Sequence, residues 1–277
     1  MALNLNASPY YDDFDGTKNY NRVLFKPGVA VQARELTQLQ TALADQLGQL
    51  ASYNLKEGGI ISGCEEKITR IAYIKVTDVD FGGTAIDNTS LVNYIGATLV
   101  GATTGLKAKV LTAKTGTTGA TPNTKILYIS YTDQAAATNT NGLIEFGIGE
   151  KLTVESDNSA INGDTFVTYN SSSAAIGDRA RYSGFTSYIT LSPGIIYARG
   201  SFIRTTEIST FIDPITLLAD RKIGFVVTEK VVASTDDNTL LDPANGSFNY
   251  NAPGADRLNF VVSLKSFNNT ETVPDNF

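Results

Sequence analysis

The sequence contains no histidine among its 277 residues. Histidine is the usual general base near neutral pH and a frequent ligand of transition metals. Its absence excludes Ser-His-Asp catalysis, Cys-His catalysis and histidine-bound metal centres. The single cysteine, Cys64, can neither form an internal disulfide nor hold a zinc ion alone, and we expect it to be a small buried side chain. We therefore predict that the protein is not an enzyme and holds no metal and no cofactor.

The sequence also lacks a basic cluster and a long apolar run. It has 22 basic and 28 acidic residues and a net charge of −6, so we expect no nucleic-acid partner. No apolar run approaches the roughly 18 residues that a membrane helix needs, and the first residues have neither the basic start nor the apolar core of a signal peptide. We expect a soluble protein made in the cytoplasm, without membrane insertion.

What the sequence does contain is typical of a β-rich structural protein. It has 13 tyrosines, 13 phenylalanines and 24 glycines, and Ser, Thr and Asn are abundant. Aromatic residues favour strands, whereas the small polar residues and glycine favour turns. With 42% hydrophobic residues, a chain of this length can bury a substantial core. The predicted fold is mainly β, with one long N-terminal helix.

That helix is predicted over about residues 31–54. Its apolar residues recur in steps of three and four, which place them in one stripe along a helix. They are Ala33, Leu36, Leu39, Leu43, Leu47 and Leu50. Leu36, Leu43 and Leu50 are seven residues apart, which suits a contact between identical subunits. The alternative, an amphipathic helix packed on its own domain, stays open at this point.

Residues 1–24 show no steady period, and we predict an extended arm laid on other surfaces. Its aromatic residues should find pockets on a neighbouring chain or on this chain's own β domain. These candidate interaction residues are Tyr10, Tyr11, Phe14 and, at the start of the helical segment, Phe25. The acidic run before Gly16 does not fit a calcium loop, because an EF-hand register puts Arg22 where a bidentate glutamate belongs.

The remaining pattern predicts strands in two regions. Residues 68–79 and 175–277 form a sandwich-like β body, which includes a hairpin over 187–198, strands over 202–211, 222–232 and 257–265, and an ordered loop over 236–257. Residues 80–174 are rich in Gly and Thr, with short strand candidates. They predict an inserted small barrel or sandwich module. The predicted domains are therefore 1–67 (arm and helix), the β body, and the 80–174 insert.

Two stretches carry a resemblance to a known family. Residues 10–15 followed by 22–40 resemble the N-terminus of a family of tail structural proteins of cyanophages and other contractile-tailed phages. Residues 240–242 and 249–257, the second running from Asn249 and Tyr250 to Asp256 and Arg257, are similar to the downstream region of that family, and 197–202 is similar between them. Residues 242–246 depart from the family's Asp-Asn-Ala-Gln-Gly, and residues 80–174 carry no match.

The resemblance implies a virion structural protein of the tail or baseplate, assembled in the host cytoplasm. Such a protein would be an adaptor that attaches a tail fibre or peripheral component to other tail and baseplate proteins. By analogy with tail fibres, a homotrimer is the first expectation and a dimer the second. Asn249, Tyr250, Asp256 and Arg257 join the candidate interaction residues on this basis.

Two other functions compete with the adaptor. A receptor- or glycan-binding tail module would use exposed rings in aromatic-rich loops, although Tyr and Phe also simply fill β cores. A glycosidase would need paired carboxylates such as Asp236 and Asp237, or Glu65 and Glu66. Adjacent carboxylates on a strand point to opposite faces, so neither pair is placed to flank one glycosidic bond.

Overall fold

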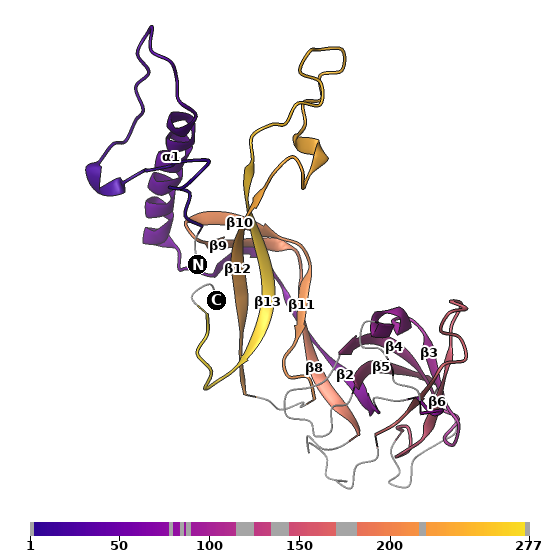
Figure 1. The fold of residues 1–277 in the computed structure, drawn as a ribbon. Coiled ribbons are helices and arrows are strands. Elements are labelled where there is room, and N and C mark those ends of the chain that lie inside the picture. Colours follow the sequence, from indigo (N-terminus) through magenta and orange to yellow (C-terminus); the bar gives the residue numbers. More distant parts are fainter. Residues whose placement is uncertain are drawn as a thin grey trace. The chain divides into compact units, whose positions relative to one another are not determined.

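The computed structural model describes residues 3–77, 80–83, 86, 90–114, 125–133, 144–169, 182–215 and 220–274. The fold is mainly β with one α-helix in this part of the chain, as predicted (Figure 1). The chain divides into two compact units. The first comprises Met1–Glu66, Thr190–Ser209 and Lys222–Phe277, and the second comprises Lys67–Ile189 and Thr210–Arg221.

The first unit holds two small antiparallel sheets that pack face to face. One consists of β1 (Gly59–Gly63), β9 (Gly194–Ala198) and β10 (Ser201–Thr205), and the other of β12 (Arg221–Val232) and β13 (Arg257–Asn268). Ile196 and Ile203 from the first sheet share a buried cluster with Val227, Phe225 and Phe260 from the second. This packing has two layers, as predicted for the β body, but it includes β1, which lies in the region predicted to be arm and helix.

A tight hairpin joins β9 to β10. Its two turn residues, Arg199 and Gly200, have φ of 55° and 69°. Two successive positive φ values match the twist of the flanking strands, which is why such turns favour hairpins. The pairing of Ala198 with Ser201 follows directly from this turn.

The hairpin predicted over 187–198 is wrong. β8 (Ser183–Leu191) and β9 belong to different sheets, and β9 pairs with β1 and β10 instead. The chain does not form a hairpin at Pro193-Gly194. Gly194 instead begins β9 and pairs with Gly63 of β1. A Cβ on Gly194 would lie 2.5 Å from both the Cys64 Sγ and the Ser62 carbonyl oxygen, so only glycine fits there.

The second unit is built on an eight-stranded sheet in the order β11-β8-β2-β5-β4-β3-β6-β7. The strands not yet bounded are β2 (Glu66–Val76), β3 (Thr98–Gly101), β4 (Lys107–Lys114), β5 (Lys125–Asp133), β6 (Lys151–Glu155), β7 (Thr165–Val167) and β11 (Ile208–Phe211). One isolated antiparallel bridge, between Val76 at the end of β2 and Thr168 just after β7, links the β7 edge of the sheet to β2. Among the described strands no continuous ladder closes, so the predicted small barrel is not formed.

Both faces of the central strands are buried. On one face, Ile74 and Leu127 join the largest apolar cluster of the unit. On the other face, Tyr73 packs with Tyr128 and Phe211, and the Tyr128 and Phe211 rings stack with centroids 3.9 Å apart. A strand covered on both faces shows no alternation of apolar and polar residues.

The division into units differs in its bounds from the predicted domains. β2 was predicted as part of the β body but lies almost entirely in the second unit, which extends beyond 80–174 at both ends. That residues 80–174 form a separable module stays a prediction.

The packing of β1 on β9 generates a stability prediction. Replacing Gly194 by Ala forces a Cβ into Cys64 and the Ser62 carbonyl, and such overpacking costs about 1–3 kcal/mol. The matched control is Gly16→Ala, whose Cβ would meet its nearest atoms at an ordinary 3.6 Å. Chemical denaturation should show a lowered midpoint for Gly194→Ala alone; equal midpoints for both variants would contradict the packing described.

Candidate assembly surface

The helix α1 (Ala33–Asn54) begins two residues after its predicted start and ends where predicted. Its first turn carries a capping box, in which the Gln32 backbone N–H donates to the Glu35 carboxylate at 2.9 Å. This reciprocal arrangement satisfies backbone donors that the first turn of a helix leaves unpaired. At 1.5 Å per residue the helix is about 33 Å long.

The face that α1 turns toward its own chain is small and polar. The residues of this face are buried or half-buried and recur at helical spacing. They are Thr37, Gln38, Thr41, Ala42, Asp45, Gly48 and Ala51. The helix is therefore attached to its own unit by side chains that contribute little apolar burial.

The β9–β10 hairpin holds this face at Gly48. A Cβ on Gly48 would lie 3.4 Å from the Cα and the carbonyl oxygen of Gly200, so the two backbones are nearly in contact. The Tyr197 hydroxyl donates a hydrogen bond to the Gly48 carbonyl oxygen at 3.0 Å. Together these contacts fix the rotation of α1 about its own axis.

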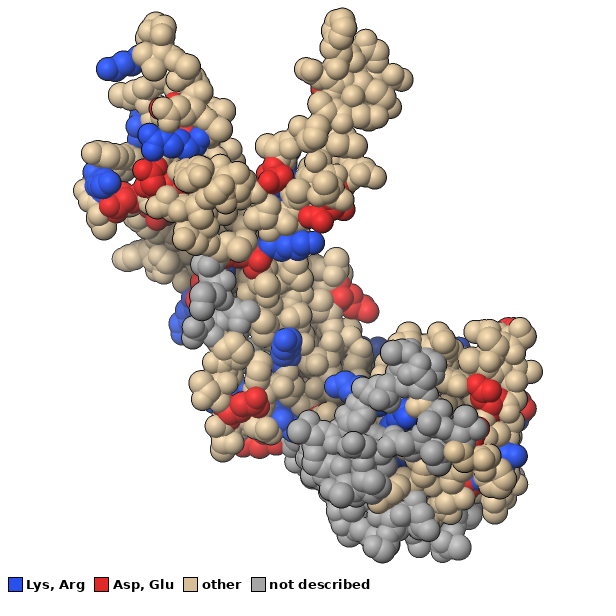
Figure 2. Space-filling model, viewed as in Figure 1, with Lys and Arg blue, Asp and Glu red and all other residues tan. Residues whose placement is uncertain are grey.

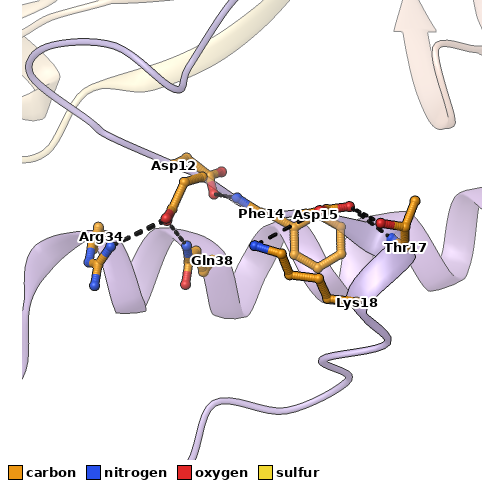
Figure 3. Close-up of polar contacts among 8 residues, drawn as sticks. Asp12, Phe14, Asp15, Thr17, Lys18, Arg34 and Gln38 are labelled. Atoms are coloured by element: carbon orange, nitrogen blue, oxygen red, sulfur yellow. Dashed lines mark hydrogen bonds and ion pairs between the residues drawn. The ribbon is translucent and has the colours of Figure 1, made fainter.

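The arm holds the same face nearer its N-terminal end. Asp12 is buried, and its carboxylate accepts hydrogen bonds from the Thr41 hydroxyl at 2.6 Å and from the Phe14 backbone N–H at 3.3 Å. Asp13 accepts from the Gln38 amide and lies 3.4 Å from the Arg34 guanidinium. Figure 3 shows Arg34 and Gln38 of α1 pointing toward the arm. Hydrogen bonds to charged groups thus dock the arm.

A cavity of about 520 Å³ lies between the arm and α1. Asp13, Phe14, Arg22 and Arg34 are among the residues that line it. In the part of the chain that the structure describes, no three His, Cys, Asp or Glu side chains gather as a metal site would require. Likewise, no described helix is long and apolar enough to span a membrane.

The opposite face of α1 carries the leucine stripe, which we define as Leu36, Leu39, Leu43, Leu47 and Leu50. These five side chains are between 38% and 65% exposed. The helix does pack on its own domain, but through the face opposite to this stripe. An aligned row of exposed leucines is an apolar surface of the kind that binding sites use, and its role in binding stays a prediction.

The predicted aromatic anchors of the arm have different environments. The Tyr10 hydroxyl donates to the Asp256 carboxylate at 2.5 Å, and this hydrogen bond raises the pKa of Tyr10. Phe14 is half-buried, whereas Tyr11 and Phe25 are exposed. Within a single chain, Tyr11 and Phe25 therefore do not find the pockets that the sequence analysis expected.

Exposed apolar residues also mark the entry loop, which we define as residues 24–31. Leu24, Phe25, Val29 and Val31 are between 48% and 83% exposed. The entry loop extends past the N-terminal end of α1, at the top of the indigo segment in Figure 1. Of these four residues, only Phe25 was predicted as an interaction residue. The apolar character of the neighbouring valines and leucine is the sequence signal that points to the other three.

The long loop, which we define as residues 233–256, is ordered by its own hydrogen bonds. An isolated bridge joins Leu241 to Pro253, and the Asp242 backbone exchanges hydrogen bonds with Ala252 and Asn251. The Asp242 carboxylate also accepts from the Ala244 backbone N–H at 2.8 Å. The loop is ordered, as predicted, and it packs on itself.

The remaining candidate residues lie on or beside the long loop. Tyr250 is 48% exposed and Phe248, which the sequence analysis did not select, is fully exposed. The Asn249 carbonyl accepts from the Ala252 N–H, and the Arg257 guanidinium donates to the Ala255 carbonyl at 2.6 Å. Residues 243–255 contain no charged side chain, and Figure 2 shows this part of the loop almost free of charge.

Of the predicted residues, the structure brings together Tyr10 and Asp256, which join the arm to the base of the long loop. The N-terminal end of the arm is held separately, because the Leu3 backbone N–H donates to the Glu229 carboxylate at 2.7 Å and Arg199 lies 3.9 Å from the same carboxylate. The leucine stripe, the entry loop and the exposed rings of the long loop are thus apolar surfaces on segments that polar contacts hold in place. The roles of the candidate residues in binding stay predictions.

Comparison with protein families gives one match. A family model described as a domain of unknown function, DUF4815, matches residues 8–114 and 173–274. The matched residues include the arm from residue 8 onward, α1 and the long loop, and the segment between the two matched ranges holds β5, β6 and β7. No curated protein matches the chain, and no solved structure does.

The docking of the arm generates the next prediction. Asp12→Ala removes the carboxylate that accepts from the Thr41 hydroxyl and the Phe14 backbone N–H, and it should loosen the arm, because a hydrogen bond to a charged group contributes about 1.5–3 kcal/mol. The control is Asp15→Ala, since Asp15 contacts only Thr17 and Lys18 within the arm. Hydrogen exchange should quicken over residues 5–21 in Asp12→Ala and only near residues 15–19 in the control. The same local pattern in both variants would show that Asp12 does not hold the arm.

Proposed function

The chain belongs to the DUF4815 family, which is described as a domain of unknown function. From the resemblance of its arm, α1 and long loop to tail proteins, together with the exposed leucine stripe, we propose that it is a virion structural protein of a phage tail. Its role is that of an adaptor that attaches a tail fibre or peripheral component to the baseplate or tail end. It works without catalysis, as a homo-oligomer, with a trimer as the first expectation and a dimer as the second. Its other partners are tail and baseplate proteins.

One observation carries this proposal. Helix α1 attaches to its own chain through small and polar residues and leaves the leucine stripe exposed. A helix that served only its own core would turn its leucines inward, because burial of a leucine side chain contributes about 1.5–3 kcal/mol. The inverted arrangement is what an assembly helix needs.

The resemblance to tail proteins supports the same role from the sequence. The two stretches that carry it fold into the arm with α1 and into the long loop. The exposed rings of Phe248 and Tyr250 on the long loop are suitable surfaces for contacts with other tail proteins. Self-association through α1 and attachment through the long loop are thus assigned to different residues.

A receptor- or glycan-binding tail module is the second candidate. The exposed rings of Phe248 and Tyr250, on a loop with amide side chains at Asn249 and Asn251, favour it, because sugars stack on rings and bind planar polar groups. Location distinguishes the two functions. An antibody against this chain should label the tail end or baseplate of purified virions if the chain is an adaptor, and the distal tips of fibres if it is a receptor binder. Absence of the chain from virions would contradict both.

Self-association generates a direct prediction. The wild-type chain should scatter light as an oligomer at micromolar concentration, and Leu43→Asp should scatter as a folded monomer, because a charge in an apolar contact between subunits breaks it. Leu43 is 61% exposed in the single chain, so the variant should keep the wild-type circular dichroism spectrum.

Ser52→Asp provides the matched control, since Ser52 is exposed on the helix away from the leucine stripe. It should remain oligomeric. A monomeric wild type, or equal loss of assembly in both variants, would contradict the proposal. Unfolding of Leu43→Asp would instead show that the stripe is covered within its own chain.

A further inference from the structure

We infer that copies of this chain associate through α1 as a parallel, in-register coiled coil. The inference rests on the self-association proposed above and adds the identity of the occupant, its orientation and its register. The occupant of the leucine stripe is the same stripe on a second copy. Each copy then contributes identical residues at equal heights along the contact.

The spacing of the exposed residues fits the two contact positions of a heptad repeat. Leu36, Leu43 and Leu50 occupy the first position, and Leu39, Gln46 and Tyr53 occupy the second. Tyr53 is 90% exposed in the single chain, and Gln46 is exposed as well. Three successive layers of each kind are therefore available to a partner helix.

The flanks of the stripe suit an identical partner. Positions 40, 47 and 49, which border the contact and are exposed, are Gln, Leu and Gln. Ala42, at a fourth bordering position, is already buried against its own chain, and Glu35 would lie beside Gln40 of a parallel, in-register partner. No like charges would therefore oppose each other there when two copies meet, whereas charged flanks would select a partner of opposite charge.

The helix can accept a second copy without losing its own attachments. Thr41 and Gly48, which hold the arm and the β9–β10 hairpin, occupy the heptad position that points directly away from a coiled-coil partner. The arm and the body therefore flank an assembled coil on its outside.

Gln46 decides between the two orientations. In a parallel, in-register coil the Gln46 side chains of the copies face each other and can exchange amide hydrogen bonds. In an antiparallel coil the first positions face the second positions, so Gln46 would face Leu43, and its buried amide would lack a partner. An unsatisfied buried polar group is costly, and a paired one at such a position fixes the register.

The parallel orientation also accounts for the entry loop. It brings the entry loops of all copies together at the N-terminal end of the coil. Leu24, Phe25, Val29 and Val31, which are exposed in the single chain, then gain apolar neighbours from the other copies. An antiparallel coil would separate these loops by roughly the length of α1, about 33 Å.

Disulfide trapping tests the orientation. In a Cys64→Ala background, Leu36→Cys and Leu50→Cys are prepared as separate proteins and oxidised mildly. A parallel, in-register coil predicts that each forms covalent dimers with itself as the main product. In an antiparallel coil residue 36 lies beside residue 53 of the partner. Two thiols introduced at position 36 are then about 25 Å apart along the axis, far beyond the roughly 4.4–6.8 Å between the Cα atoms of a disulfide.

The controls separate this inference from the proposed function. Ser52→Cys, away from the contact, should stay uncrosslinked, and light scattering confirms that each variant is still an oligomer before oxidation. If the oligomer is intact but crosslinks form only when Leu36→Cys is mixed with Tyr53→Cys, the parallel orientation is wrong while self-association stands. An intact oligomer without any of these crosslinks would also overturn the inference. A wild type that is monomeric at every concentration removes the proposed self-association itself.

Discussion

The close approach of Gly48 to Gly200 determines which side of α1 faces the solvent. Side chains on both residues are absent, so the helix backbone lies almost on the hairpin turn, and the Tyr197 hydroxyl bonds the helix carbonyl at the same point. Once Gly48 is held against the hairpin, helical geometry places the leucine stripe on the other side. The exposed stripe is thus a consequence of a backbone contact between segments far apart in the sequence.

The arm and α1 are attached to their own unit mainly through polar contacts, so their apolar surface stays exposed. The arm docks through the carboxylates of Asp12 and Asp13, and the stripe and the entry loop stay outside. Fully burying a leucine contributes about 1.5–3 kcal/mol, so five half-exposed leucines contribute several kcal/mol per chain. Association costs on the order of 4–15 kcal/mol in lost freedom. The free energy available from burying the stripe alone is therefore near the lower limit of this cost. The apolar entry loop is the nearest further surface that association could bury.

Local patterns in the sequence were sufficient for α1 and for most strands. The leucine period and the breaks around it located α1 to within two residues at its start, and the strands predicted over 222–232 and 257–265 lie where β12 and β13 form. These elements depend on residues that are close in the sequence. The mainly β fold with one helix follows from the same patterns.

What the sequence could not show depends on contacts between distant segments. Pro193-Gly194 has the composition of a turn, but Gly194 begins β9 and pairs with Gly63 of β1, close to Cys64. The Arg199-Gly200 turn was missed because arginine is not typical of a residue with positive φ. The outward direction of the leucines could not be read from their period, since a stripe has the same spacing whether it faces a core or a second copy.

Sedimentation equilibrium of the unmodified chain across a wide range of concentration tests the central claim most directly. An exposed leucine stripe that serves assembly predicts a mass of two or three chains at high concentration, with dissociation toward a single folded chain on dilution. A mass of one chain at every concentration would contradict the account, because the stripe would then remain exposed to water without a partner of its own kind.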